Sequence, residues 1–163
     1  LHRLVGSEMC IRDRKTTIAT KIINKLSSNN FRVASIKHAH HEFDIDHENT
    51  DSFKHRLAGS SQVIVSSSKR WVKISELNNS KEKSLDELIN QLSEIDIVIV
   101  EGFKNENHPK IEIIKNDNDN DNYLFTKIKN IKAIITNNKL KTDLRIFKND
   151  EIDNIVDFIL REF

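Results

Sequence analysis

Lysine and threonine at the start of a predicted helix could bind the phosphates of a nucleotide. In a phosphate-binding loop of the pattern G-x-x-x-x-G-K-[ST], the lysine contacts the β- and γ-phosphates and the next hydroxyl binds Mg²⁺. This chain of 163 residues has Lys15-Thr16-Thr17 at that place, but Met9 and Arg14 stand where the pattern needs glycine. Because both glycines are missing, K-T-T alone is better explained as an ordinary helix start.

A second candidate is the carboxylate that follows a strongly apolar run. Residues 96–100 (DIVIV) predict a strand that is buried on both faces of a parallel sheet. Open α/β sheets bind ligands beyond the carboxyl ends of their strands, where Glu101 and Gly102 would lie. A carboxylate there suits a phosphate-bound metal ion, and it is equally well explained as the ordinary end of a strand.

The third candidate is a segment rich in histidine and aspartate that follows a predicted strand. It comprises residues 37–46 (KHAHHEFDID) and 51–56 (DSFKHR). Imidazole and carboxylate groups suit zinc or nickel, but His40 and His41 point to opposite sides if the backbone is extended. A solvated loop is the plainer explanation. The density of ionisable groups directly after a strand nevertheless favours a binding loop.

The apolar pattern predicts strands that alternate with helices. Apolar residues recur at helical spacing over 15–26 and over 152–163. Shorter helices are predicted at 52–58 and from 84 onward, and the polar tract 116–122 is expected to be a solvated loop. The predicted strands are 31–37, 62–66, 71–74, 96–100, 110–115 and 131–136, with 62–66 and 71–74 as neighbours. This alternation predicts one three-layer α/β domain with a largely parallel sheet.

Composition and charge restrict the partners. The 26 lysine and arginine residues nearly balance the 25 aspartate and glutamate residues, which leaves a net charge of +1. This balance gives no overall attraction to nucleic acid or to an anionic membrane. No apolar run approaches the roughly 20 residues that span a bilayer, and the N-terminus lacks the apolar core of a signal peptide. Because Cys10 is the only cysteine, an internal disulfide is excluded. We therefore expect a cytoplasmic protein.

Taken together, the three segments resemble the MobB family of accessory proteins in molybdopterin-guanine dinucleotide biosynthesis, which belongs to the P-loop nucleotide-binding class. The similarity covers roughly residues 15 to 163. It is carried by KTT at 15–17, IKHAHHEFDID at 36–46, DSFKHRLAGS at 51–60, IVEGFK at 99–104 and HPKIEI at 108–113. The resemblance implies a three-layer P-loop NTPase-like fold with a mostly parallel sheet, in which the first strand and the phosphate loop are degraded or replaced.

The resemblance also implies a function. The chain would be a GTP-binding accessory protein with at most weak GTPase activity, and it would assist the guanylyltransferase MobA. GTP and Mg²⁺ are the implied cofactors, molybdopterin or its molybdenum form is a further implied ligand, and a homodimer is the implied assembly. No residue is expected to be catalytic, and Thr16 and Glu101 would lie at the Mg²⁺ ion. The residues implied to contact nucleotide, pterin or partner protein are Lys15, Thr16, Thr17, Lys37, His38, His41, Asp44, Asp46, Asp51, Ser52, His55, Arg56 and Lys104.

Residues 1–14 (LHRLVGSEMCIRDR) offer neither the first strand nor the glycine loop that the family would have there. Family-like sequence starts abruptly at Lys15, so we expect residues 1–14 to be a non-native segment and 15–163 to be the nucleotide-binding domain. His2 to Gly6 could still add a strand to the sheet. Because Arg14 carries a side chain where the backbone must approach phosphate closely, we expect the chain as written to bind GTP poorly.

Two other functions fit parts of the same pattern. One is a P-loop metallochaperone-like GTPase, whose nickel or zinc ligands would be His38, His40, His41 and His55. The other is a nucleoside or small-molecule kinase, which would need arginines that close over the phosphates. The arginines Arg56, Arg70 and Arg145 do not cluster in the sequence, which disfavours the kinase.

Overall fold

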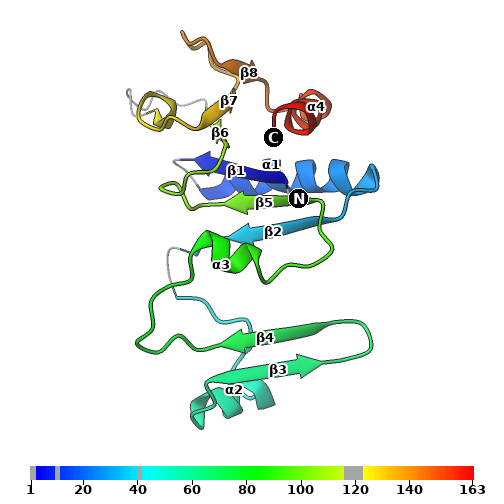
Figure 1. The fold of residues 1–163 in the computed structure, drawn as a ribbon, viewed down its shortest axis with the longest axis vertical. Helices are drawn as coiled ribbons and strands as arrows, with labels where there is room; N and C mark the ends of the chain where they lie inside the picture. The colour runs from blue at the N-terminus through cyan, green and yellow to red at the C-terminus, as the bar shows by residue number, and fades with distance from the viewer. Residues whose placement is uncertain (1–2, 10–11, 40–41, 116–122) are drawn as a thin grey trace. The chain divides into compact units, whose positions relative to one another are not determined.

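The computed structural model describes residues 3–9, 12–39, 42–115 and 123–163 of the chain. Contacts divide the chain into two compact units (Figure 1): residues 1–38 with 85–163 form the larger unit, and residues 39–84 form the smaller one. Each unit has a sheet of its own. The span 15–163, which the sequence analysis treated as one domain, thus contributes to two units.

The larger unit is built on a six-stranded sheet in the order β2-β5-β1-β6-β7-β8. Each strand runs parallel to its neighbours. The strands are β1 (Arg3–Met9), β2 (Val33–Lys37), β5 (Ile97–Glu101), β6 (Lys110–Ile113), β7 (Ile131–Ile135) and β8 (Arg145–Phe147). The mostly parallel sheet predicted from the alternation of strands and helices is confirmed.

Helices cover both faces of this sheet. On one face, α1 (Arg12–Ser28) and α4 (Ile152–Glu162) contact each other and bury one set of alternate side chains of β5. On the other face, the short helix α3 (Leu85–Ile89) packs against the second set. This burial on both faces explains the nearly unbroken apolar sequence of β5. None of the helices in the described part of the chain has the length and apolar character needed to cross a membrane.

The strand β1 comes from the segment that was expected to be foreign, residues 1–14. Its backbone pairs with β5 on one side and with β6 on the other, so this segment does supply a strand. The connection from β5 to β6, residues 102–109, passes beside β1 at Gly6. The Gly6 amide donates to the Pro109 carbonyl at 3.0 Å, and a Cβ at position 6 would lie 2.2 Å from Nε2 of His108. This close approach leaves room only for glycine.

Strand β6 buries two charged side chains, Lys110 and Glu112. Lys110 donates to two carbonyls of the preceding loop. The Glu112 carboxylate accepts the amides of Leu124 and Phe125, each at 2.8 Å, at the start of the 3-10 helix η1 (Leu124–Thr126). Burial raises the pKa of Glu112, and the two amides act against that rise. Both charges thus bind backbone segments that flank the sheet.

The smaller unit consists of α2 (Asp51–Leu57) and an antiparallel hairpin of β3 (Gln62–Ser66) and β4 (Trp71–Ser75). The two strands predicted to be neighbours are therefore confirmed as neighbours. Val63 is the one buried apolar side chain among the described residues of this unit. A two-stranded sheet with so small a core needs further contacts to be stable.

Candidate functional site

Three predicted site residues meet at the carboxyl-terminal edge of the larger sheet. Glu101 ends β5, and its register partners are Lys37 on β2 and Ser7 on β1. Helix α1 follows β1 along the chain, which brings Thr16 to the same edge. This edge is where open α/β sheets bind their ligands, as the sequence analysis expected for Glu101.

The Glu101 carboxylate is the centre of this group. Thr16 Oγ1 donates to it, at 3.3 Å from Oε1 and 3.5 Å from Oε2. Lys37 Nζ lies 3.6 Å from Oε1, and the Lys37 side chain is 62% exposed whereas that of Glu101 is 16% exposed. Lys15, one residue before Thr16, is buried. A hydroxyl, a shielded carboxylate and an ammonium group therefore lie together, a set that can bind a metal ion and attract a phosphate.

Helix α1 starts earlier than predicted. It was predicted to open at Lys15, but it begins at Arg12. The helix can extend back to Arg12 because no glycine or proline interrupts residues 12–15. The free amides of a helix belong to its first turn, which is residues 12–14 here and does not include Thr16. Only residues 10 and 11 separate β1 from α1. Residues 9–16, which have the length of the phosphate-loop pattern, therefore end a strand at Met9 and are helical from Arg12 onward.

The turn after Glu101 joins the ends of β5 and β2. The His38 amide donates to the Glu101 carbonyl at 2.8 Å. Gly102 has a φ of +94°, and a Cβ on it would lie 2.7 Å from His38 Cβ. Phe103 also has a positive φ, 61°, and its ring centroid lies 4.9 Å from that of His38. Such a conformation is uncommon for an aromatic residue and is typical of constrained sites. His38 thus contacts the turn that follows Glu101.

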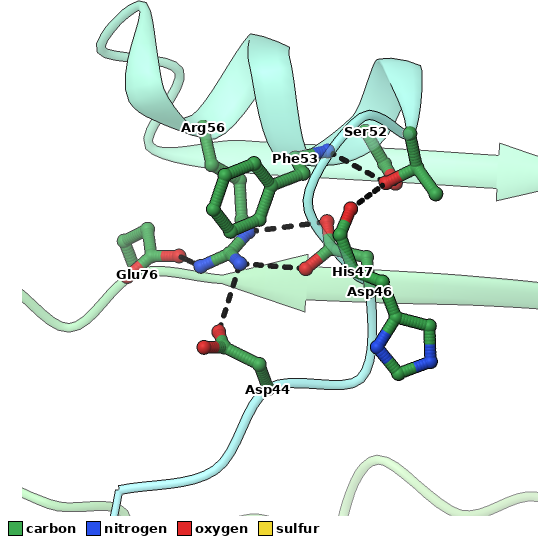
Figure 2. Close-up of polar contacts among 8 residues, drawn as sticks. Asp44, Asp46, His47, Ser52, Phe53, Arg56 and Glu76 are labelled. Carbon is green, nitrogen blue, oxygen red and sulfur yellow. Dashed lines mark hydrogen bonds and ion pairs between the residues drawn. The ribbon is translucent and has the colours of Figure 1, made fainter.

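In the smaller unit, Arg56 joins three carboxylates (Figure 2). Its guanidinium donates to Asp46 at 2.6 and 3.2 Å, to Glu76 at 2.7 Å and to Asp44 at 2.8 Å. The Phe53 ring lies against it, with its centroid 5.3 Å from Cζ. The hydrogen bond from Arg56 holds the pKa of Asp46 below its usual range, and the carboxylates raise the pKa of Arg56. The cluster ties the loop before α2 to the end of β4.

The predicted site residues are divided between the two units. Those in the larger unit are Lys15, Thr16, Thr17, Lys37, His38, Glu101 and Lys104. Those in the smaller unit are Asp44, Asp46, Asp51, Ser52, His55 and Arg56. Some of them are exposed, namely Thr17, Lys104 and His55, and Asp51 forms an exposed ion pair with Lys54 at 3.6 Å. The predicted contact His41 lies outside the described residues.

The proposed nickel or zinc ligands do not assemble in the described structure. Across residues 3–9, 12–39, 42–115 and 123–163, no three histidine, cysteine, aspartate or glutamate side chains are placed to hold a metal ion. His38 lies beside Phe103 in the larger unit, and His55 is an exposed residue of the smaller unit. His40 and His41 are outside the described residues.

Four polar residues that the structure holds in contacts have no predicted role, namely Glu76, His108, Lys110 and Glu112. Glu76 follows a short strand, and nothing in its local pattern indicates a partner. His108 and Lys110 belong to the HPKIEI block that resembles the family, which was the available signal. The alternation of KIEI puts Lys110 and Glu112 on one face of a strand, but it does not reveal that this face is covered.

Comparisons with known proteins agree on one family. A family model described as "Molybdopterin guanine dinucleotide synthesis protein B" (MobB) matches residues 5–137. The molybdopterin-guanine dinucleotide biosynthesis adapter protein of Haemophilus influenzae is 38% identical over 152 residues, covering 89% of this chain and 80% of that protein. The adapter protein of Escherichia coli is 30% identical over 148 residues, covering 90% and 85%.

Solved structures agree with the fold. The crystal structure of a molybdopterin-guanine biosynthesis protein B superposes with a TM-score of 0.76 at 23% identity, over 96% of this chain and 97% of that one. A Bacillus subtilis MobB structure superposes with a TM-score of 0.74 at 24% identity, over 97% and 96%. The architecture of these proteins is therefore the architecture of this chain.

Proposed function

Since the chain belongs to the MobB family, we propose that it is an adapter protein of molybdopterin-guanine dinucleotide biosynthesis that binds GTP with Mg²⁺. The observation that supports a nucleotide site is the contact of the Thr16 hydroxyl with the Glu101 carboxylate at the ligand-binding edge of the sheet. Lys37 adds a positive charge at that edge.

The Thr16 and Glu101 side chains fit a magnesium ion. Mg²⁺ takes oxygen ligands at 2.0–2.1 Å in an octahedron, so adjacent ligand atoms lie about 3 Å apart. Thr16 Oγ1 and Glu101 Oε1 are separated by 3.3 Å. The ion, when bound, would neutralise phosphate charge. Lys37, whose Nζ lies 3.6 Å from Oε1 of Glu101, would add a second positive charge for the phosphate.

We expect phosphate affinity in this chain to be limited because Met9 and Arg14 stand where the phosphate loop needs glycine. The expected weak binding is tested by GTP titration of the chain and of a variant with Met9→Gly and Arg14→Gly. We expect the variant to bind at least about tenfold more tightly, because the glycines let backbone amides approach the phosphates. Equal affinities would contradict this part of the proposal.

The metal assignment is tested in the same glycine variant. Glu101→Gln removes a charged oxygen ligand, so we expect the Mg²⁺-dependent part of GTP binding to be lost. Glu106→Gln changes an exposed carboxylate in the neighbouring loop and serves as the matched control. Unchanged Mg²⁺ dependence in Glu101→Gln would exclude Glu101 as a ligand.

The partner of the adapter is the guanylyltransferase MobA. A pull-down with MobA, together with its activity at limiting GTP, tests this assignment with and without the adapter. We expect co-purification and a higher rate of guanylyl transfer, and no association would refute MobA as the partner. A molybdopterin ligand remains part of the proposed function, since the matching family is described as a molybdopterin guanine dinucleotide synthesis protein.

A homodimer is the proposed assembly, and the hairpin of the smaller unit supports it. Three of its apolar side chains are solvent-exposed, namely Ile64 (65%), Val65 (47%) and Trp71 (69%). Residues 64, 66, 71 and 73 share one face of the hairpin because Ile64 pairs with Lys73 and Ser66 with Trp71. Exposed apolar groups on a thin two-stranded sheet mark a surface that a protein chain covers. A second copy of the chain is the occupant proposed here.

A further inference from the structure

A cavity lies within the smaller unit, and all of its lining residues belong to that unit. Its volume is about 380 Å³, which is within the range of small-molecule sites. The cavity lies between the loop before α2, the end of that helix and the segment after β4. The lining residues that matter for the argument are Asp44, Phe53, Arg56, Leu57, Glu76 and Asn78.

The charge of the cavity excludes phosphate as its ligand. Arg56 is the only cation among the lining residues, and it is bound to Asp44, Asp46 and Glu76 (Figure 2). One positive charge against three negative charges leaves the cluster at −2. A ligand that donates hydrogen bonds is therefore favoured, and a ligand that brings further negative charge is repelled.

The three carboxylates have different exposure. The Asp46 side chain is 7% exposed and both of its oxygens accept from Arg56, so its function is to hold the guanidinium. Asp44 is 62% exposed and Glu76 is 37% exposed. Each of these two uses one oxygen for Arg56. Their second oxygens are the acceptors that the cavity can offer to a ligand.

The cavity also has an apolar side. Leu57, the last residue of α2, lines it and is 75% exposed. The ring of Phe53 lines it as well. A flat ring that covered Leu57 and Phe53 would gain apolar contact while its edge met the carboxylates.

We propose that this cavity binds the 2-amino-4-oxopyrimidine edge of a purine or a pterin. That edge presents a ring N–H beside an amino group, and these are two adjacent donors that carboxylate oxygens can accept. Glu76 and Asp44 accept the two donors, and Phe53 and Leu57 contact the ring. The choice of heterocycles rests on the proposed function, since guanine and pterin are the two parts of the pathway's product and share this edge.

The test uses phosphate-free probes, so that it is independent of the phosphate site. Guanosine and 6-methylpterin are titrated into the full chain and followed by calorimetry and by the fluorescence of Trp71, the only tryptophan. Adenosine lacks the 2-amino-4-oxo edge and is the control ligand. We expect at least one of the first two to bind at least tenfold more tightly than adenosine, and the tighter of them identifies guanine or pterin as the source.

Two variants locate the binding. Glu76→Gln replaces an acceptor and should weaken the binding at least tenfold, whereas Glu48→Gln, an exposed carboxylate of the same unit that does not line the cavity, should leave it unchanged. Because Glu76→Gln also removes an ion pair of Arg56, Ser61→Phe is a second variant that fills the cavity and leaves the cluster in place.

Equal binding of adenosine, binding of neither probe, or full binding by Ser61→Phe would each overturn the proposal. A chain that binds guanosine or 6-methylpterin but shows no Mg²⁺-dependent GTP binding, even with glycines at 9 and 14, would keep this proposal and refute the phosphate site. The reverse result would keep the phosphate site and refute the cavity.

Discussion

Glu101 is positioned by the residues that follow it as much as by its strand. The next residue, Gly102, has a positive φ and lies against His38 Cβ, and Phe103 continues the left-handed turn. Together these features direct the chain away from the sheet immediately after the carboxylate. The geometry of the candidate metal ligand therefore depends on a close contact between two neighbouring strand ends.

Gly102→Ala is expected to destabilise the larger unit by about 2–4 kcal/mol, because it combines positive φ with a 2.7 Å approach of the new Cβ to His38 Cβ. Gly59→Ala is the matched control, since Gly59 has a φ of +103° but nothing within 4 Å of a new Cβ. The control should lose only about 1–2 kcal/mol. Urea denaturation of both variants measures the difference, and equal losses would show that the contact with His38 has no energetic weight.

The buried imidazole of His108 makes stability depend on pH. Lys110 Nζ lies 3.4 Å from Nδ1 of His108, and an ammonium can only donate, so the neutral ring carries its proton on Nε2. Within the described residues Nε2 has no hydrogen-bond partner. Burial, and then the charge of Lys110, lower the pKa of His108 from 6.5 to about 4. Protonation would place two positive charges side by side inside the protein.

We expect the free energy of unfolding to fall as the pH is lowered from about 6.5 to about 4. In that window the unfolded chain binds a proton at His108 and the folded chain does not, and the full difference corresponds to about 3 kcal/mol. His108→Gln lacks this titration, so its unfolding free energy should depend less on pH over the same window. Denaturant titrations at several pH values measure the two slopes, and identical slopes would contradict the assignment.

At the scale of the elements, much of the larger unit could be predicted from the sequence. The run DIVIV becomes β5 because only a strand buried on both faces has such a sequence, and the stripe of 152–163 becomes α4. β8 was missed because three residues are too few for a pattern. The sequence RLVGSEM by itself does not establish β1, since the place of this strand depends on pairing with β5 and β6 rather than on its own alternation.

The start of α1 was predicted wrongly for a related reason. Comparison with a glycine loop placed the first helical residue at Lys15, whereas the helix extends back to Arg12 once the glycines are absent. For the site, the rule for open α/β sheets predicts Glu101 at the carboxyl edge of the sheet, whereas Thr16 beside it was implied by the family resemblance. The contact of Glu76 with Arg56 could not be predicted, because it joins segments 20 residues apart through side chains whose spacing has no pattern.

The buried Glu112 gives a test of how η1 is held. Glu112→Gln keeps the shape but presents an amino group to one of the two backbone amides that the carboxylate binds. We expect a loss of about 1–3 kcal/mol in unfolding free energy, the cost of an unsatisfied buried group. Faster amide hydrogen exchange at Leu124 and Phe125 should accompany it. Glu106→Gln, at an exposed position, is the control, and protected amides in Glu112→Gln would contradict this account.

At the scale of the whole molecule, the two units differ in how they are stabilised. The larger unit buries apolar side chains on both faces of its sheet. The smaller unit relies on the ion pairs of Arg56 and on one buried apolar side chain, Val63, among its described residues. Sequence periodicity predicts the helix and the two neighbouring strands of the smaller unit as well as the elements of the larger one, but it does not indicate which elements pack together. The division into two units could therefore not be predicted from the sequence.

The exposed hairpin of the smaller unit leads to a prediction about assembly. Ile64→Lys combined with Trp71→Lys places two charges on the exposed face that the proposed second copy would cover. We expect the parent chain to sediment as a dimer and the variant as a monomer at the same concentration, because a buried unpaired charge costs several kcal/mol at an interface.

The control variant Glu48→Lys adds a charge to the same unit outside the hairpin and should remain dimeric. Sedimentation equilibrium measures the masses, and circular dichroism shows whether the variant is folded. A folded variant that is still a dimer would exclude this face as the interface, and a parent chain that is a monomer would refute the dimer itself.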